Sequence, residues 1–438
     1  MTLNGTGVSG EGGALRNTAG SNTVSGNLTL GSNTRIAATG GSLTVSGNVG
    51  GGNNVLYVGA QENVAVSGVI SGAGNTQNET TTSLFKDGAK TLTLSGNNTY
   101  TGDTRVTEGR LVVAAGGNLG SGSDVFVSDG AVLAVDTDTA VASIQETANN
   151  NGGEVAIGSG ATLTINGANK GTLYQDTISG QGNLVVDGSG TTSLSLYGTQ
   201  SWTGTTTVSG GKLSTAVALA SSGVTVDGGT FETTADNVLG DTVGVTIDGG
   251  TFSVGGSDTI GVLSGAGGTL ALGSGKTLTS SFNSASNAFL ATISGDGAFA
   301  KAGSGTLMLA GNNTYTGGTT LSGGELIAGD LNAFGTGFIN VGSGTTLNLG
   351  SFNIINTITN NGGTVSSSGI VSNVDAEAGE TTIAGANSTV SQVAGTATVN
   401  VDAADVTVNS ITGGTVNSGA SGSGMQVASV SSSATLNV

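Results

Sequence analysis

Cysteine, proline and histidine are all absent from this sequence of 438 residues. Without Cys and His, the chain cannot form disulfides, thiolate nucleophiles, Cys/His metal cages, haem ligation or a His-dependent catalytic triad. Collagen is excluded as well, because it needs proline and a strict three-residue glycine period. Most classes of enzyme are therefore excluded, and neither a cofactor nor a metal is expected.

Charge is scarce and mostly of one sign. Charged residues make up 9% of the chain, and 10 Lys and Arg against 28 Asp and Glu give a net charge of −18. Nucleic acid and anionic lipid should repel such a chain, so no nucleic-acid partner is expected. No apolar run reaches the roughly 18 residues of a membrane helix. The first residues show neither the basic nor the apolar region of a signal peptide.

Glycine, by contrast, is abundant: 82 of the 438 residues are Gly, against a usual share of about 7%. Disorder is not expected, because 36% of the residues are hydrophobic and few are charged. Thr and Val fill the intervals between glycines, and both suit a pleated, half-buried surface. The composition therefore predicts short strands separated by turns.

Internal repeats organise the chain. The segment 224–231 (VTVDGGTF) recurs 21 residues later at 245–252 (VTIDGGTF). A longer phrase spans 92–111 and 307–326, and a divergent copy spans 194–213. The first and last Leu of the phrase are 19 positions apart in all three copies. Repeats of this length indicate a solenoid or a similar repeat architecture.

The period favours a parallel solenoid over a sandwich or barrel. Apolar residues alternate in twos within the phrase, which predicts strands of about 3–5 residues repeating every 19–25 residues or so. Identical residues at identical places suit coils stacked on one another. Glycine is expected to supply positive φ at the corners, and proline is absent because every strand N–H is needed.

The predicted fold is all-β, a right-handed parallel β-helix (β-solenoid) in a single elongated rod. Residues 1–350 carry the repeated phrase, and residues 351–438 are predicted to continue the solenoid with shorter, more acidic coils.

The phrase at 92–111 and 307–326 closely resembles the passenger-associated repeat of autotransporter proteins. Ile-Ser-Gly precedes each copy, at 70–72, 178–180 and 293–295. The resemblance implies a bacterial passenger that is secreted across the outer membrane, folds outside as a right-handed β-helix, and is held at the membrane only through a C-terminal translocator barrel. Neither that barrel nor an export signal is recognised in this chain, so a passenger fragment, or ends covered by partners, is expected.

The recurring positions of the phrase are predicted to be structural. An aromatic residue at one motif position indicates packing at a coil corner, and the preceding Asn is expected to hydrogen-bond turn backbone. These residues are Gly96, Asn98, Tyr100, Gly102, Gly198, Trp202, Gly204, Gly311, Asn313, Tyr315 and Gly317.

Candidate chemical sites are few. Asp227 and Asp248 should stack one coil apart, at about 4.8 Å, near the carboxylate separation of retaining glycosidases. Both lie in Asp-Gly-Gly turns, however, and the acidic run at 375–405 is read as a solvated face. Residues 119–127 nearly fit a calcium-binding nonapeptide, but one copy without a tandem partner does not predict a site. Residues 270–277 resemble a phosphate loop that lacks its first glycine and its helix.

The predicted function is that of a surface-exposed or secreted, non-enzymatic passenger: an adhesin, a self-association module or a stalk. Its partner would be a glycan or protein on a host or neighbouring cell, or a second copy. An insertion at 75–83 departs from the repeat and is the expected contact loop, with Asn75, Gln77, Asn78 and Glu79. Two alternatives remain open: a polysaccharide-active enzyme that uses Asp/Glu pairs, and a purely structural filament.

Overall fold

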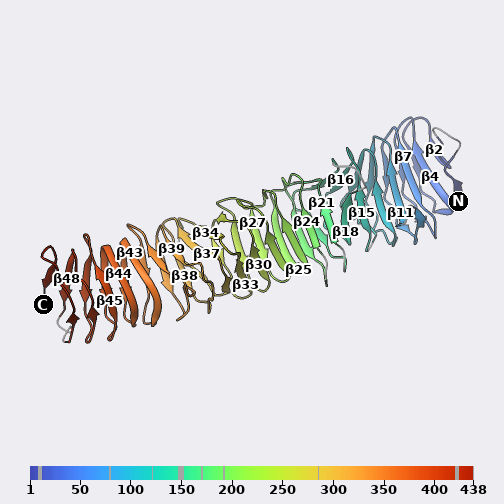
Figure 1. Ribbon diagram of the computed structural model, residues 1–438. Helices are drawn as coiled ribbons and strands as arrows, with labels where there is room; N and C mark the ends of the chain where they lie inside the picture. The colour runs from blue at the N-terminus through green and yellow to red at the C-terminus, as the bar shows by residue number, and fades with distance from the viewer. Residues whose placement is uncertain are drawn as a thin grey trace. The chain divides into compact units, whose positions relative to one another are not determined.

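The computed structural model describes residues 1–7, 12–77, 80–120, 122–146, 152–168, 171–190, 193–284, 286–419 and 424–437. Within these ranges the regular structure consists of β-strands. No helix long and apolar enough to cross a membrane is present in this part of the chain. The chain forms two compact units, Met1–Val224 and Thr225–Val438. Each is a stack of coils (Figure 1), and together they contain about 20 turns.

The first unit contains an 11-stranded sheet and an eight-stranded sheet. The strands of the larger sheet are β1 (Thr2–Gly5), β2 (Leu15–Asn17), β4 (Leu28–Ala38), β6 (Val49–Gly50), β7 (Leu56–Ala60), β9 (Ile70–Ser71), β10 (Asn75–Gln77), β11 (Thr80–Asp87), β13 (Asp103–Val106), β15 (Asp124–Val127) and β18 (Ser143–Glu146). Those of the smaller sheet are β3 (Asn22–Val24), β5 (Leu43–Val45), β8 (Val64–Val66), β12 (Thr91–Leu94), β14 (Arg110–Val113), β16 (Val132–Val135), β19 (Glu154–Ile157) and β22 (Thr177–Gly180).

Two further strand series complete the first unit. One consists of β17 (Thr139–Val141), β20 (Thr162–Ile165), β23 (Asn183–Asp187) and β25 (Thr205–Gly210). The other consists of β21 (Gly171–Tyr174), β24 (Ser193–Leu196) and β26 (Lys212–Thr215). The strand β27 (Gly223–Val226) includes the unit boundary.

The second unit begins with short series and continues into one 17-stranded sheet. The short series contain β28 (Thr230–Thr233), β29 (Gly244–Ile247), β30 (Thr251–Val254), β32 (Leu263–Ser264), β33 (Thr269–Leu272) and β36 (Thr292–Gly295). The large sheet contains β31 (Asp258–Ile260), β34 (Thr277–Ser281), β35 (Asn287–Phe289), β37 (Ala298–Ala302), β38 (Thr306–Leu309), β39 (Thr319–Leu321), β40 (Glu325–Ala328), β41 (Ile339–Val341), β42 (Thr346–Asn348), β43 (Ile354–Ser367), β44 (Val371–Ile383), β45 (Thr389–Val393), β46 (Thr398–Val401), β47 (Thr407–Val408), β48 (Thr415–Ser418), β49 (Gln426–Val427) and β50 (Thr435–Asn437).

Like residues of successive coils lie in register. Leu92 of β12 pairs with Val64 of the preceding coil and with Leu111 of the following one, both in parallel orientation. In the second unit, Phe231 pairs with Phe252, and their rings stack with centroids 5.2 Å apart. Among the described strands, the pairing of β10 with β11 is antiparallel, at the insertion. The prediction of a parallel β-solenoid is confirmed.

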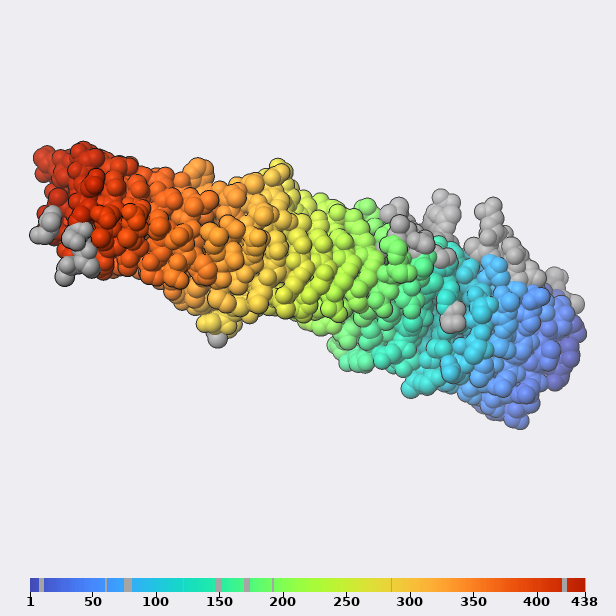
Figure 2. All heavy atoms as spheres, turned by 90° about the horizontal axis from the view of Figure 1, so that it is seen from below, coloured from blue at the N-terminus to red at the C-terminus, as the bar shows by residue number. Residues whose placement is uncertain are grey.

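The core is a column of Val, Leu, Ile and aromatic side chains inside each coil. In β12 and β14 every second residue points inward: Leu92, Leu94, Leu111 and Val113 are fully buried. Figure 2 shows the atoms of successive coils in close contact. A strand bonded on both sides uses its N–H groups in the ladder, which explains why the chain has no proline.

Some strands are longer than the predicted 3–5 residues. β43 has 14 residues, and it pairs with β41 through Ile358 and with β42 through Thr364. One continuous strand therefore passes along two faces of its coil, where the preceding coil breaks at a turn between β41 and β42. The pairing of β43 with β44 shifts register on both sides of Asn361, which accommodates the bend. The division predicted at residue 350 stays a prediction.

Candidate functional site

The aromatic residue of each repeat lies inside its coil. Tyr100, Trp202 and Tyr315 are fully buried. The polar atom of each ring meets the hydroxyl of a Thr four residues later: Tyr100 Oη and Thr104 Oγ1 are 2.7 Å apart, Trp202 Nε1 donates to Thr206 Oγ1 at 3.2 Å, and Tyr315 Oη and Thr319 Oγ1 are 2.5 Å apart. Burial raises the pKa of Tyr100 to about 12 and also raises that of Tyr315. The rings are therefore not available for stacking against a sugar.

The recurring Asn of the phrase connects three successive coils. Asn98 is buried, and its Oδ1 accepts the N–H of Ile70 in the preceding coil at 2.8 Å. Its Nδ2 donates to the carbonyl of Asn118 in the following coil at 2.7 Å. Asn313 repeats this arrangement with Ile293 N–H at 2.7 Å and the Ala333 carbonyl at 2.6 Å. We call this arrangement the amide clamp.

The divergent copy keeps only the contact with the preceding coil, and it does so with a longer side chain. Gln200 stands where the other copies have Asn, and its Oε1 accepts the N–H of Ile178 at 3.2 Å. Its Nε2 donates to the carbonyls of Asp176 and Gly198, at 3.1 and 2.9 Å. In all three copies the clamped N–H belongs to the Ile of the Ile-Ser-Gly segment, which explains why that segment accompanies the phrase.

The glycines of the phrase allow close stacking of coils. A Cβ on Gly96 would collide with the carbonyl of Gly68, and one on Gly311 with that of Ala291. A Cβ at Gly102, Gly198, Gly204 or Gly317 would likewise collide with backbone atoms of the preceding coil. None of these six has positive φ. At these six positions the need is clearance between backbones, whereas Gly109, Gly211, Gly318 and Gly324 of the phrase adopt the positive φ expected at corners.

Two buried lysines lead into the first and third copies, and the sequence patterns did not single them out as site residues. The ammonium of Lys86 donates to the carbonyls of Asp87, Gly88 and Glu108, at 3.1, 2.5 and 2.8 Å. Lys301 donates to Ala302, Gly303 and Gly323, at 2.5, 3.0 and 3.3 Å. Burial lowers the pKa of each lysine to about 8. Each ammonium ties its own turn to the next coil.

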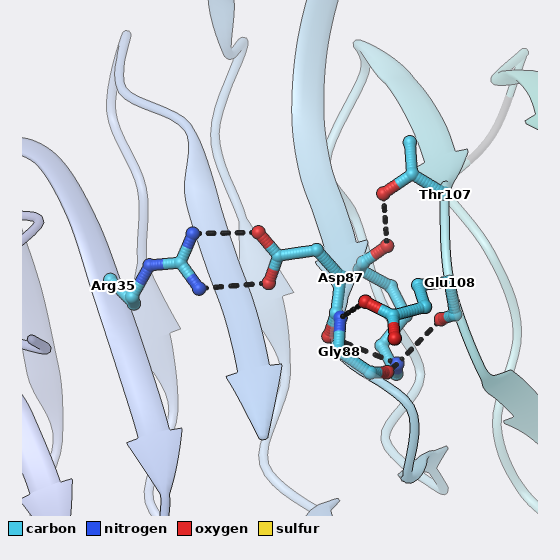
Figure 3. A network of polar contacts seen from close by, with 6 residues as sticks. Arg35, Asp87, Gly88, Thr107 and Glu108 are labelled. Carbon is cyan, nitrogen blue, oxygen red and sulfur yellow. Dashed lines mark hydrogen bonds and ion pairs between the residues drawn. The ribbon is translucent and has the colours of Figure 1, made fainter. Parts of the chain in front are cut away.

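An ion pair next to Lys86 crosses an entire strand (Figure 3). Arg35 of β4 and Asp87 of β11 flank β7, and their two hydrogen bonds measure 2.8 and 2.6 Å. A Cβ on Gly59 of β7 would collide with both side chains, so this glycine creates the passage. The carboxylate of Glu108 extends the network by accepting the N–H of Gly88 at 3.1 Å.

An outward-facing column follows the same sheet through successive coils. Arg35 pairs in register with Tyr57, Tyr57 with Phe85, Phe85 with Arg105, and Arg105 with Phe126. The centroids of Tyr57 and Phe85 lie 5.2 Å apart, and the Arg105 guanidinium lies 4.2 Å from the centroid of Phe126. Neighbouring side chains therefore cover the ring faces, so the column stabilises the sheet. The residues of the column are unevenly spaced along the chain, so no sequence period indicates it.

Asp227 and Asp248, the candidate glycosidase carboxylates, are turn residues. Thr230 pairs with Thr251, which places Asp227 and Asp248 at equivalent positions of stacked coils. Both side chains are exposed. The Oδ1 of Asp248 accepts the N–H of Ala266 at 3.0 Å, a structural role in the next turn.

The predicted contact loop is partly described. Asn75 and Gln77 belong to β10, which forms an antiparallel hairpin with β11. Asn78 and Glu79 lie outside the described residues. Since β11 also carries Phe85, Lys86 and Asp87, the hairpin grows out of the strand that the Arg35–Asp87 network holds. Its role as a contact loop stays a prediction.

No group of three or more Asp or Glu side chains within the described ranges is placed to hold a metal ion. The nonapeptide-like segment 119–127 contains β15, where Asp124 accepts the hydroxyl of Ser143 at 2.7 Å. Its carboxylate serves the protein itself.

Comparison with known proteins identifies the recurring unit. The family model described as passenger-associated-transport-repeat matches residues 84–113, 184–214 and 299–328. These segments contain Asn98, Gln200 and Asn313 as well as both buried lysines. Searches of curated proteins and of solved structures each found no match.

Proposed function

We propose that this chain, which carries three passenger-associated-transport repeats and so resembles autotransporter passengers as predicted, acts at the bacterial cell surface as a non-catalytic contact module. Its role would be adhesion to a host or neighbouring cell, or self-association. The repeats imply an autotransporter passenger and, with it, an extracellular or surface location. The identification of the role rests on how the chain uses its functional groups.

The observation that carries the proposal is that the polar groups of the repeats are turned inward. The amide of Asn98 and the ammonium of Lys86 bond to backbone within the coils, and the hydroxyl of Tyr100 bonds to buried Thr104. The recurring phrase therefore builds the solenoid, and the outer faces are left for contact with other molecules.

Those outer faces are ladders of small polar side chains. Asn417 donates to Asn400 at 2.9 Å, and Asn437 donates to Asn417 at 2.7 Å. Thr246 and Ser264 lie 2.9 Å apart on another face. Each such group offers a weak hydrogen bond at coil spacing, and many weak contacts along one surface add up to avidity.

Surface display tests the proposal. Cells that display the chain should settle faster than control cells or bind host-cell surfaces or immobilised glycans, and purified protein should compete. A variant in which residues 75–80 are replaced by a short glycine link shows how much the hairpin contributes to clumping or binding. Its matched control replaces the exposed turn residue Asp227 by Asn. Displaying cells that neither clump nor bind, with correctly folded protein on their surface, would refute the proposal.

The enzymatic alternative uses Asp/Glu pairs, and Asp227 with Asp248 is the pair that the sequence offers for it. Release of reducing sugar from polysaccharides by the purified chain, lost in Asp227→Asn and Asp248→Asn, would replace the contact role with catalysis.

A further inference from the structure

Two acidic side chains from coils two turns apart converge on one pair of glycines. Asp129 lies in the turn between β15 and β16, Gly152–Gly153 lies directly before β19, and Asp176 lies directly before β22. Val132 pairs with Glu154, and Glu154 pairs with Thr177, so these three turns are stacked. The glycine turn is the middle one.

Both carboxylates lean over that middle turn. A Cβ on Gly152 would collide with Oδ1 of Asp129, and one on Gly153 would lie 2.8 Å from Oδ2 of Asp176. The N–H of Gly152 donates to Oδ1 of Asp176 at 2.6 Å. The absence of a side chain at both glycines thus lets the two carboxylates approach the same turn.

One oxygen of this pair has no partner. Asp176 is 2% exposed, and its Oδ2 accepts no hydrogen bond from any described residue. Burying an ionised carboxylate oxygen without a partner is costly. The arrangement is short of positive charge.

The Arg35–Asp87 pair shows how the same fold resolves a similar arrangement. There, too, side chains from coils two turns apart meet across a glycine, Gly59, but one of them is a cation. No ion pair between described residues includes Asp129 or Asp176. The carboxylates of Asp129 and Asp176 therefore meet around Gly152–Gly153 without a cation such as the Arg35 guanidinium that pairs with Asp87 over Gly59.

We propose that a divalent metal cation binds between the carboxylates of Asp129 and Asp176, across Gly152–Gly153, with Ca²⁺ as the test ion. Ca²⁺ takes oxygen ligands and completes its shell with carbonyls and water. With two carboxylates, the expected affinity is that of extracellular modules, with a Kd of about 10⁻⁴–10⁻³ M. The inference does not depend on adhesion.

Calorimetric titration of the whole purified chain with CaCl₂ at neutral pH tests the site, together with thermal unfolding followed by circular dichroism. At about ten times Kd, Ca²⁺ should raise the unfolding temperature by about 2 °C or more, whereas NaCl at equal ionic strength should not. Asp176→Asn and Asp129→Asn should each weaken Ca²⁺ binding by about tenfold or more.

Glu154→Gln is the matched control. It removes the same charge in the middle coil, directly after Gly153, from a carboxylate that accepts the Ser179 hydroxyl at 2.5 Å, and it should keep the calcium response. Asp129 is exposed, so Asp129→Asn tests the site even if Asp176→Asn fails to fold. Three results would overturn the proposal: no response in the unmodified chain, an undiminished response in Asp129→Asn, or an equal loss in Glu154→Gln. None of these measurements involves cells, so they are independent of the contact role.

Discussion

Replacing Asn98 by Ala should destabilise the first unit far more than the same change at its neighbour Asn97. Asn98 is 3% exposed, and its side chain satisfies the Ile70 N–H and the Asn118 carbonyl. Leaving a buried polar group unpaired costs about 1–3 kcal/mol. Two such groups predict a loss of about 2–6 kcal/mol in the free energy of unfolding.

Asn97 provides the matched control. Its side chain is exposed, and it loses only the 3.0 Å bond from Asn118 Nδ2. Asn97→Ala should therefore cost about 0.5 kcal/mol or less. Urea unfolding followed by the fluorescence of the single tryptophan, Trp202, reports on the same unit because this side chain is fully buried there. If the two variants unfold at the same urea concentration, the amide clamp does not stabilise the coils, and the reasoning fails.

Three further predictions concern titrating groups and clearance. The pKa of Tyr100 is raised to about 12 in the folded chain, whereas an unfolded Tyr ionises near about 10. Stability should therefore fall by up to about 1.4 kcal/mol per pH unit above about pH 10, and Tyr100→Phe should reduce this slope; equal slopes would contradict the assigned burial. The pKa of Lys86 is lowered to about 8, so the unfolded chain binds the extra proton between that pH and about 10.5. Stability should rise from about pH 8 towards pH 10, and urea titrations of Lys86→Met should show a smaller rise, because Lys301 keeps its own lowered pKa. Gly59→Ala should cost about 1–3 kcal/mol because its Cβ would push Arg35 and Asp87 apart. Gly26→Ala has open space and ordinary φ, so its urea midpoint should stay close to that of the unmodified chain, and a similar loss in both would refute the clearance argument.

The repeated phrase was enough to locate the corner residues. Tyr100 and Asn98 could be recognised because their positions recur without a gap in a second copy, and repetition at a fixed interval survives any change in coil size. Their partners could not be found in this way. Asn118 and Ile70 lie 20 and 28 residues from Asn98. Such unequal distances carry no periodic signal.

Insertions are the reason for this limit. The hairpin of β10 and β11 lengthens one coil, so Tyr57 and Phe85 are 28 residues apart although they are neighbours, whereas Phe85 and Arg105 are separated by 20. Lys86 likewise meets the carbonyl of Glu108 only because both turns stack at one corner. No rule of composition or spacing predicts which residues of unequal coils coincide.

The amino-acid sequence by itself determined that this chain stacks parallel coils around an apolar column. Apolar residues that alternate along short strands, glycine where backbones approach closely and the absence of proline together favour stacked parallel coils. Only the tertiary structure decided which side chains meet across coils: the cation of Arg35 with Asp87 over Gly59, and the two carboxylates of Asp129 and Asp176 around Gly152. The physical reason is that the turns between stacked strands differ in length, so residues that meet across coils lie at unequal distances along the chain.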